Sequence, residues 1–224
     1  INTMQDRSGG FYSTIDADSE DVEGKYYVWD ENELQRILSK NEYIIIKETF
    51  FVYNKPNFEG KYHFHVTKIN EKNYENNISE FEPIKNKLID ARNKRVSPRI
   101  DKKILVSWNS LAITGLLESF KLTNEIKYYK SARKCFNFIK QQMWKNNKLY
   151  ACFHDEPYFE GYLDDYAYLS KNCIEFLKIN WNEDDFVFLE KLMKVLINNF
   201  QDKTHGGFFF TSDDHEELIY RPKT

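Results

Sequence analysis

Carboxylates stand at the same point of a motif that the sequence contains twice. Residues 9–16 read GGFYSTID and residues 206–213 read GGFFFTSD, so two glycines, an aromatic residue, a threonine and a final aspartate recur in register. An aspartate can act as a general acid or base. We therefore treat Asp16 and Asp213 as related positions in two copies of one structural unit.

The first copy of the motif continues into further carboxylates. Asp16, Asp18 and Glu20 alternate with other residues, so an extended backbone would place their side chains on one face. The spacing does not fit an EF-hand calcium loop, which needs glycine where Asp21 stands and glutamate where Tyr27 stands. We predict Asp16 and Asp18 as catalytic residues, with a solvated, turn-forming loop as the alternative.

A second pair of carboxylates, Asp164 and Asp165, opens a predicted helix. Aspartate at a helix start commonly caps the backbone N–H groups, and capping is the alternative role for Asp164. Glycoside hydrolysis needs two carboxylates roughly 5–10 Å apart across the scissile bond. We predict Asp164 and Asp165 as catalytic residues and Asp213 as a substrate-binding residue. If the repeated units close on one another, Asp16, Asp165 and Asp213 converge on one cavity.

Aromatic residues make up 17% of the chain, which predicts flat ring surfaces in the core or in a pocket. Trp108 and Asn109 start a predicted helix, and His205 directly precedes the second glycine motif. We predict that the substrate contacts Tyr12, Trp108, Asn109, Tyr166 and His205. The alternative for the aromatic residues is packing in the core.

Apolar residues at helical spacing predict a mainly helical second half of the chain. The predicted helices cover residues 111–122, 126–143, 165–179 and 186–200. The second of these is expected to bury Ala132, Cys135, Phe136, Ile139 and Met143. The fourth is expected to bury Phe186, Leu189, Met193, Leu196 and Phe200. Short strands are predicted at residues 148–153 and 207–211.

The first hundred residues have a mixed pattern. Aromatic-rich strands at residues 10–14 and 25–29 predict a β-hairpin with a long acidic loop. Asp30 is expected to cap the helix that follows, with Glu33 completing a capping box. Two further elements are predicted, a surface loop over residues 68–79 and a helix over residues 81–95.

The order helix, turn, helix, strand and acidic loop occurs twice. Met143 and Phe200 take equivalent places, 57 residues apart (200 minus 143). Helical hairpins cannot bury their apolar faces alone, so they must stack. We predict a mainly α fold, a partial six-hairpin α/α toroid with short β-hairpin insertions, and an open solenoid is the alternative. We expect a single truncated domain over residues 1–224, with a β-hairpin and helices in 1–100 and two helical hairpins with short strands in 101–224.

Composition argues against several classes of function. The net charge is -3, with basic residues scattered, so we predict no nucleic-acid partner. Apolar stretches are too short to span a bilayer and no signal peptide is evident, so we predict a cytoplasmic protein with no membrane partner. The three cysteines form no Cys-x-x-Cys pair, and His63 and His65 lack a third ligand nearby. We therefore predict no cofactor and no metal.

Four blocks of the sequence match one known family in order and span nearly the whole chain. They are GGFYSTIDADSE and EGKYYVW within residues 9–29, DKKILVSWN at 101–109, GYLDDYA at 161–167, and GGFFFT with RPK within 206–223. Together these blocks resemble the spermatogenesis-associated protein 20 family of thioredoxin-domain-containing proteins.

The resemblance implies a fold more than a reaction. The family has an N-terminal thioredoxin-like domain, which this chain lacks and which would be its partner in the full-length family. The rest of the family's length resembles the six-hairpin toroid of sugar epimerases and glycosidases, and this chain matches a middle portion. No reaction is securely assigned to the family.

Taken together, the residues predict a domain that binds or processes a carbohydrate-like polar ligand at a carboxylate- and aromatic-lined mouth. Two alternatives stay open. One is a non-enzymatic interaction scaffold for a thioredoxin-like domain, and the other is an inactive gene fragment.

Overall fold

The computed structural model describes residues 1, 3–51, 55–215 and 218–223, and it forms two compact units. Unit 1 comprises Ile1–Thr14 and Asp101–Thr224, and unit 2 comprises Ile15–Ile100. The chain passes from one unit to the other through two short strands, β1 (Thr14–Ile15) and β4 (Ile100–Asp101). A single domain over residues 1–224 stays a prediction, and each unit is described by itself.

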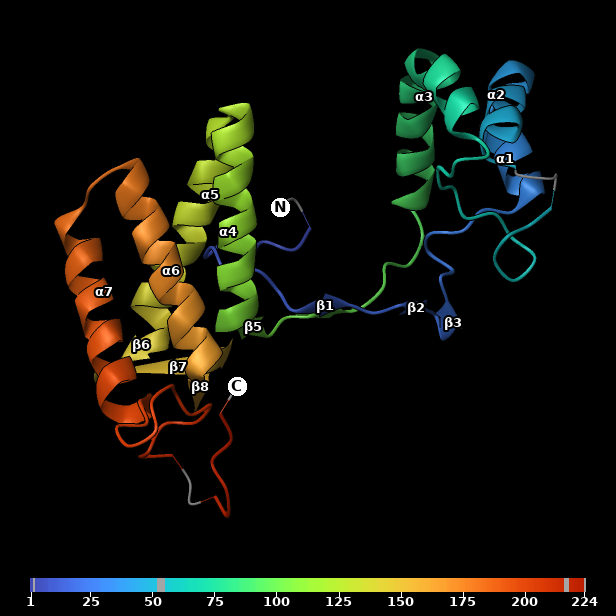
Figure 1. Ribbon diagram of the computed structural model, residues 1–224. Coiled ribbons are helices and arrows are strands. Elements are labelled where there is room, and N and C mark those ends of the chain that lie inside the picture. Colours follow the sequence, from blue (N-terminus) through green and yellow to red (C-terminus); the bar gives the residue numbers. More distant parts are fainter. Residues whose placement is uncertain (2, 52–54, 216–217, 224) are drawn as a thin grey trace. The chain divides into compact units, whose positions relative to one another are not determined.

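Unit 1 is built on two helical hairpins (Figure 1). Their helices are α4 (Val106–Thr123), α5 (Ile126–Phe138), α6 (Leu163–Ile179) and α7 (Glu183–Val195). The first hairpin turns sharply because Asn124 adopts a left-handed conformation with φ of 58° after α4. All four predicted helices are present, which confirms the mainly helical fold class with short strands.

Both hairpins end in the same irregular turn. A π-helical segment follows α5 at Ile139–Met143, and another follows α7 at Leu196–Phe200. The segments are 57 residues apart (196 minus 139) and end on Met143 and Phe200, which are both fully buried. The structure therefore repeats with the period that the sequence predicts.

A tight β connection follows each π-helical segment. After the first, β6 (Trp144–Lys145) pairs with β7 (Lys148–His154), with Trp144 opposite Leu149. After the second, Gln201 is bridged to Phe208 in the same way. Strand β7 continues into a sheet with two partners, β5 (Ile104–Leu105) and β8 (Glu156–Glu160).

The N-terminal segment forms a third connection of this kind. Gln5 is bridged to Phe11, and the Asp6 N–H donates to the Gly10 carbonyl at 2.8 Å. In the other copy of the glycine motif, the Asp202 N–H donates to the Gly207 carbonyl at 2.9 Å. The repeated motif therefore begins earlier than the glycines, with Gln5-Asp6 in one copy and Gln201-Asp202 in the other.

The strand predicted over residues 207–211 is wrong as a continuous element. Only isolated bridges are present there, at Phe208 and Phe209. Gly206 and Gly207 have φ of 75° and 77°, which is left-handed rather than extended backbone, so the strand cannot begin at Gly207. The predicted strand over 148–153 is confirmed by β7.

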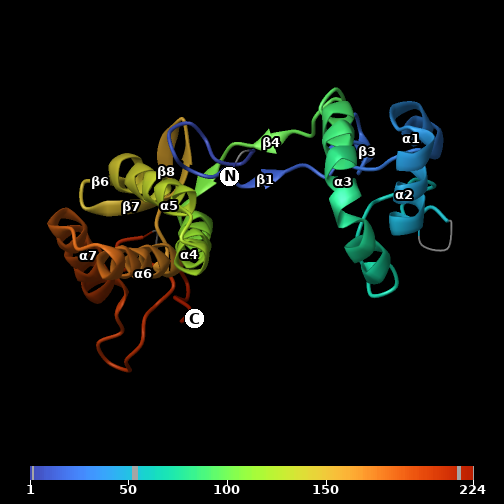
Figure 2. The ribbon, with the colours of Figure 1, turned by 90° about the horizontal axis from the view of Figure 1, so that it is seen from above.

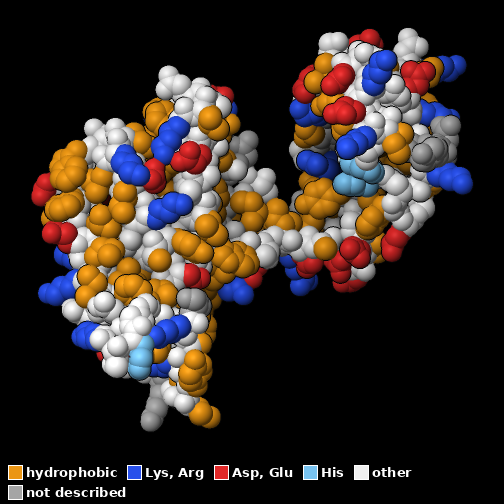
Figure 3. Space-filling model, in the orientation of Figure 1, with side chains coloured by type: hydrophobic (Ala, Val, Ile, Leu, Met, Phe, Trp, Pro, Cys, Tyr) orange, Lys and Arg blue, Asp and Glu red, His pale blue; other side chains and the backbone are white. Residues whose placement is uncertain are grey.

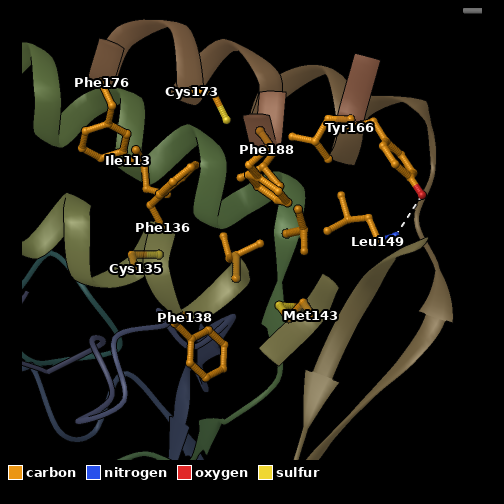
Figure 4. Packing of buried hydrophobic residues seen from close by; sticks show 14 of the residues in the cluster. Ile113, Cys135, Phe136, Phe138, Met143, Leu149, Tyr166, Cys173, Phe176 and Phe188 are labelled. Atoms are coloured by element: carbon orange, nitrogen blue, oxygen red, sulfur yellow. Dashed lines mark hydrogen bonds between the residues drawn. The ribbon is translucent and has the colours of Figure 1, made fainter. Parts of the chain in front are cut away.

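One hydrophobic core joins the two helical hairpins of unit 1. Phe136 of α5 lies 5.0 Å from the Phe176 ring of α6 and 6.1 Å from the Phe188 ring of α7 (Figure 4). The predicted core stripe of α5 is confirmed, because Ala132, Cys135, Phe136, Ile139 and Met143 are all fully buried. These interhairpin ring contacts are a main part of the apolar burial that stabilises unit 1.

The predicted core stripe is confirmed at Leu196 and Phe200, which are buried, but within α7 it is wrong by a small rotation of the helix. Phe188 and Leu192 are buried, whereas Met193 is 38% exposed. The rotation is fixed by Asp185, a buried carboxylate that forms ion pairs with Arg133 and Lys140 of the other hairpin. A buried carboxylate must keep such partners, so the face that carries Asp185 turns inward.

Unit 2 is a small helical unit in which α1 (Glu31–Ile37) and α2 (Lys40–Phe50) pack against α3 (Glu71–Arg92) (Figure 2). Asp30 caps α1, as predicted, by accepting hydrogen bonds from two backbone N–H groups. The predicted capping box is wrong, because Glu33 instead pairs with Arg95 at 2.9 Å. A capping box is present one helix later, between Ser39 and Glu42.

The predicted β-hairpin also differs in the structure. The β-hairpin is formed by β2 (Asp18–Ser19) and β3 (Val22–Glu23), not by strands at residues 10–14 and 25–29. Its turn residues Glu20 and Asp21 have positive φ, which glycine-based turn signals do not reveal.

Helix α3 begins inside the stretch predicted as a surface loop. The reason is Asn70, a buried residue whose side-chain amide donates to the carbonyls of Thr49 and His65. The hydrogen bond to Thr49 links residues 21 positions apart in sequence, and the two bonds together fix the start of a helix whose first turns are polar.

Candidate functional site

A cavity of about 340 Å³ lies in unit 1 where α4 and α6 begin. It is lined by carboxylates, by aromatic rings and by the strands that precede the two helices. The lining residues are Lys103, Leu105, Ser107, Ala151, Cys152, Tyr158, Phe159, Tyr162, Asp164, Asp165 and Phe210. Two of the four predicted catalytic residues, Asp164 and Asp165, are therefore at this cavity.

Asp165 is a buried carboxylate that ties the starts of α4 and α6 together. One oxygen accepts the Ser107 N–H at 2.8 Å, and the other accepts the Tyr162 N–H at 2.9 Å. Burial raises the pKa of Asp165 to about 6, although both backbone hydrogen bonds act in the opposite direction. Asp165 therefore has a structural role at the starts of the two helices.

Asp164 is half-buried and lies one residue earlier on α6. Its Oδ1 accepts the backbone N–H of Asp165 at 3.1 Å. Within the described residues, no side chain donates a hydrogen bond to Asp164, so its second oxygen is free to accept one from a ligand. The two neighbouring carboxyl groups thus have different environments, one partly solvated and one buried.

The aromatic lining comes mainly from β8 and from the residue before α6. Tyr158 and Phe159 are consecutive, and consecutive side chains on a regular strand point to opposite faces. Phe159 has a φ of 55°, which is unusual for an aromatic residue and departs from the regular strand geometry. Both rings line the cavity, and Phe159 is 68% exposed.

Tyr162 continues the aromatic surface toward the second glycine motif. Its ring stacks on Phe210 at 5.2 Å and on His215 at 5.4 Å, with interplanar angles of 14° and 29°. The Lys148 ammonium pairs with Glu160 at 2.7 Å and with Asp214 at 2.8 Å, which holds the segment before His215 against the β7 and β8 strands.

The hydroxyl of Tyr158 stays protonated over the physiological pH range. A hydrogen bond with Cys152, together with burial, raises the pKa of Tyr158 to about 12. The cavity thus combines a hydroxyl group, a carboxylate acceptor and flat rings, which are the groups that bind a polar ring-shaped molecule.

Four of these lining aromatics were missed from the sequence, namely Tyr158, Phe159, Tyr162 and Phe210. A signal existed for three of them, because residues 158–162 read YFEGY and end two residues before Asp164. Two of the predicted binding residues, Asn109 and Tyr166, are instead buried.

The side chains of Asn109 and Tyr166 both accept hydrogen bonds from backbone N–H groups. Asn109 accepts the Phe11 N–H at 2.7 Å and donates to the carbonyls of Phe11 and Leu105. The Tyr166 hydroxyl accepts the Leu149 N–H at 2.9 Å, as Figure 4 shows. These contacts give both residues a structural role, and neither lines the cavity.

The other predicted binding residues in unit 1 lie apart from the cavity lining. Tyr12 donates its hydroxyl to Asp6 at 2.6 Å. Trp108 is 52% exposed on α4, and the His205 ring is near the Asp202 carboxylate at 3.4 Å. Asp213 is exposed, and its backbone N–H donates to the Asn199 carbonyl. Ligand binding by these four residues stays a prediction.

Asp16 and Asp18 belong to unit 2 and are exposed. The Asp16 carboxylate accepts the Asp18 N–H at 3.1 Å, which is the turn-forming arrangement given above as the alternative. Because Asp165 and Asp213 belong to unit 1, convergence of Asp16 with them on one cavity stays a prediction.

No cluster of three or more metal-ligating side chains occurs in the described part of the chain. His63 and His65 stack on each other at 5.7 Å, and the amide of Asn57 lies 3.3 Å from the His65 ring. A search over the same residues finds no helix long and apolar enough to cross a bilayer.

Comparison with known proteins supports the family resemblance. An uncharacterised protein of Caenorhabditis elegans is 25% identical, and the alignment covers 99% of this chain and 35% of that protein. Spermatogenesis-associated protein 20 of Homo sapiens is 23% identical over 92% of this chain and 32% of its own length, as is its Mus musculus counterpart. The chain spans about a third of the length of these relatives.

Other comparisons give less. No protein-family model matches the chain. Among solved structures, cellobiose 2-epimerase from Bacillus thermoamylovorans has a TM-score of 0.46 and 12% identity, over 95% of this chain and 55% of that chain. A score this low supports no conclusion about closure of the hairpins into a ring. The curated relatives therefore carry the comparison, and by them the chain resembles spermatogenesis-associated protein 20.

Proposed function

We propose that the cavity at the starts of α4 and α6 binds a carbohydrate-like polar ligand. The observation that carries the proposal is the combination of the Asp164 carboxylate with four aromatic residues, of which Phe159 is exposed, around a cavity of about 340 Å³. That volume is within the range of small-molecule sites, which are mostly apolar with a few placed polar groups. A monosaccharide or disaccharide unit has this character, with an apolar ring face and hydroxyls at its edge.

The residues would divide the work of binding. The Phe159 ring, which is 68% exposed, offers a face for a sugar ring to stack upon. Asp164 would accept a hydrogen bond from a ligand hydroxyl, and the Tyr158 oxygen, whose O–H is engaged by Cys152, would accept another. Asp165 would keep the two helix starts in place rather than contact the ligand, since backbone N–H groups occupy both of its oxygens.

The test is to titrate this chain with a panel of monosaccharides and disaccharides and to measure binding by isothermal titration calorimetry. We expect at least one sugar to bind, and we expect Asp164→Asn and Phe159→Ala each to weaken it about tenfold, equivalent to 1.4 kcal/mol. Asp184→Asn and Trp181→Ala are the matched controls, because both residues are exposed and neither lines the cavity.

Two outcomes would overturn the proposal. One is that no sugar of the panel binds, and the other is that the control variants lose as much affinity as the cavity variants. Either result favours the second candidate, a non-enzymatic scaffold that serves a thioredoxin-like domain in the longer relatives. The observation that favours this second candidate is that the chain covers only about a third of the length of those relatives, so other parts of them are available as partners.

A further inference from the structure

Unit 2 contains a separate small cavity whose lining is aromatic and basic. Its volume is about 200 Å³. Trp29 and Phe64 stack at 6.3 Å in its wall, and α3 contributes Phe81, Leu88 and Arg92. Figure 3 shows the corresponding surface of unit 2, where His side chains lie beside hydrophobic, Lys and Arg side chains.

Charge in this cavity has one sign. His63, Lys85 and Arg92 line it, and no carboxylate is among its lining residues. Lys85 is neutralised by Glu82, which lies 2.9 Å away. Arg92 forms no ion pair with any described residue, and its Nε is buried without a hydrogen-bond partner. An arginine is always charged, so this site holds a cation that has no carboxylate partner among the described residues.

Arg95, less than one helical turn later, shows how the same unit satisfies an arginine. Both Glu33 oxygens lie 2.9 Å from its Nη2, and the carbonyls of Lys25, Tyr26 and Val28 accept from its Nη1. Its guanidinium also covers the Trp29 ring at 4.1 Å. The Arg92 side chain, in contrast, forms no hydrogen bond with any side chain or carbonyl of the described residues.

Aromatic rings hold the Arg92 guanidinium at the cavity. It lies 5.4 Å from the Tyr26 ring centre and 5.9 Å from the Tyr27 ring centre. Such contacts orient a planar guanidinium without neutralising its charge. The planar fork of donors then remains available for a carboxylate or phosphate, which arginine binds with two parallel hydrogen bonds.

We propose that this cavity binds a small anion carried on an aromatic ring, with the anionic group on Arg92 and the ring against the apolar lining, which includes Phe64, Phe81 and Leu88. The volume is below the roughly 300 Å³ at which sites for drug-sized molecules begin, so it fits a single-ring ligand. This site lies wholly within unit 2 and does not depend on the sugar site proposed for unit 1.

The experiment is to titrate the full chain with four probes and to monitor the backbone amide signals by two-dimensional NMR. Benzoate and phenyl phosphate carry both required features, benzyl alcohol carries only the ring, and acetate carries only the charge. We expect both aromatic anions to shift amide signals of residues around Trp29 and Arg92. We expect benzyl alcohol and acetate to bind at least about tenfold more weakly, since each loses one of the two interactions.

Variants assign the charge to one residue. Arg92→Gln should weaken benzoate binding at least about tenfold. Lys94→Gln, an equal charge change at an exposed residue that does not line the cavity, should leave it unchanged. Arg92→Lys keeps the charge without the planar fork, so it should bind benzoate with an intermediate affinity.

Clear outcomes would overturn the inference. They are benzyl alcohol binding as tightly as benzoate, equal losses in Arg92→Gln and Lys94→Gln, or no amide shift near Trp29 with any probe. Circular dichroism of each variant separates loss of the site from loss of the fold. If Arg92→Gln does not fold, Arg92→Lys and the four-probe comparison on the unaltered chain still decide the question.

Discussion

Asn109 and Tyr166 are equivalent residues that each accept a backbone N–H hydrogen bond, Asn109 through its amide oxygen and Tyr166 through its hydroxyl. Each is the fourth residue of its helix, in α4 and in α6, and they are 57 residues apart (166 minus 109). Each accepts a backbone N–H from the far strand of the preceding β connection, Phe11 in one case and Leu149 in the other. The repeat thus preserves the position of an acceptor while the side chain that supplies it changes.

Removal of the Tyr166 hydroxyl should be costly for unit 1. Tyr166→Phe keeps the ring in the core but leaves the buried Leu149 N–H without its acceptor, which costs about 1–3 kcal/mol of the free energy of unfolding. The measurement is thiol labelling during urea unfolding, because all three cysteines are buried in unit 1. Tyr168→Phe, at a ring that is 38% exposed, is the control and should change stability little.

The helical half of the chain could be predicted because its signals are local. Apolar spacing located all four helices, and the 57-residue period located both π-helical ends. The rotation of α7 could not be predicted, because Phe186 and Phe188 offer two apolar stripes of similar strength. The choice between them depends on Asp185 and its partner Arg133, which come from different hairpins.

The site was predicted only in its carboxylates for the same kind of reason. Asp164 and Asp165 follow a local rule for helix starts. Whether Phe159 points into the cavity depends on a left-handed backbone angle at a residue that rarely adopts one, and no propensity reveals it. The start of α3 similarly depends on Asn70 and its hydrogen bond to Thr49, 21 residues earlier in the chain.

The two copies of the glycine motif should respond differently to the same substitution. Gly9 has a φ of 125°, and an added Cβ would lie 2.5 Å from the Lys134 carbonyl oxygen. Gly206 has a φ of 75° with open space around it. Gly206→Ala should therefore cost only the left-handed strain of about 1–2 kcal/mol.

Gly9→Ala should cost clearly more, because the clash is with backbone that cannot rotate away. Urea unfolding of the two variants, followed by the same thiol labelling, makes the comparison. Equal losses of stability in both variants would contradict the close packing of the N-terminal segment on α5.

Asp165 should make unit 1 less stable as pH rises from about 4 to about 6. Burial raises the pKa of Asp165 from its ordinary value of 3.8 to about 6, so the folded state binds more protons than the unfolded state in that interval. Stability therefore falls as the carboxyl group ionises, by an amount on the order of 2–3 kcal/mol.

Other carboxylates oppose this trend only at lower pH. Glu175 and Asp214, each with a pKa lowered to about 2 by hydrogen bonds from lysine, lose their stabilising effect as pH falls below about 4. Urea unfolding at pH 4.5 and pH 7 isolates the Asp165 contribution. Asp165→Asn should be less stable overall but should lose most of the difference between the two pH values, whereas Asp164→Asn should retain it.

The rotation of α7 is testable with two neighbouring residues of similar size. Leu192 is fully buried, so Leu192→Ala removes core contacts and should cost about 2–5 kcal/mol. Met193 is 38% exposed, so Met193→Ala should cost less than about 1 kcal/mol. Had the sequence pattern set the rotation, the order of the two costs would be reversed.

Arg133→Leu should also be strongly destabilising, because it leaves the buried Asp185 with Lys140 as its remaining partner. Unfolding of the three variants, compared under one set of conditions, therefore tests whether an interhairpin ion pair decides which stripe of α7 enters the core.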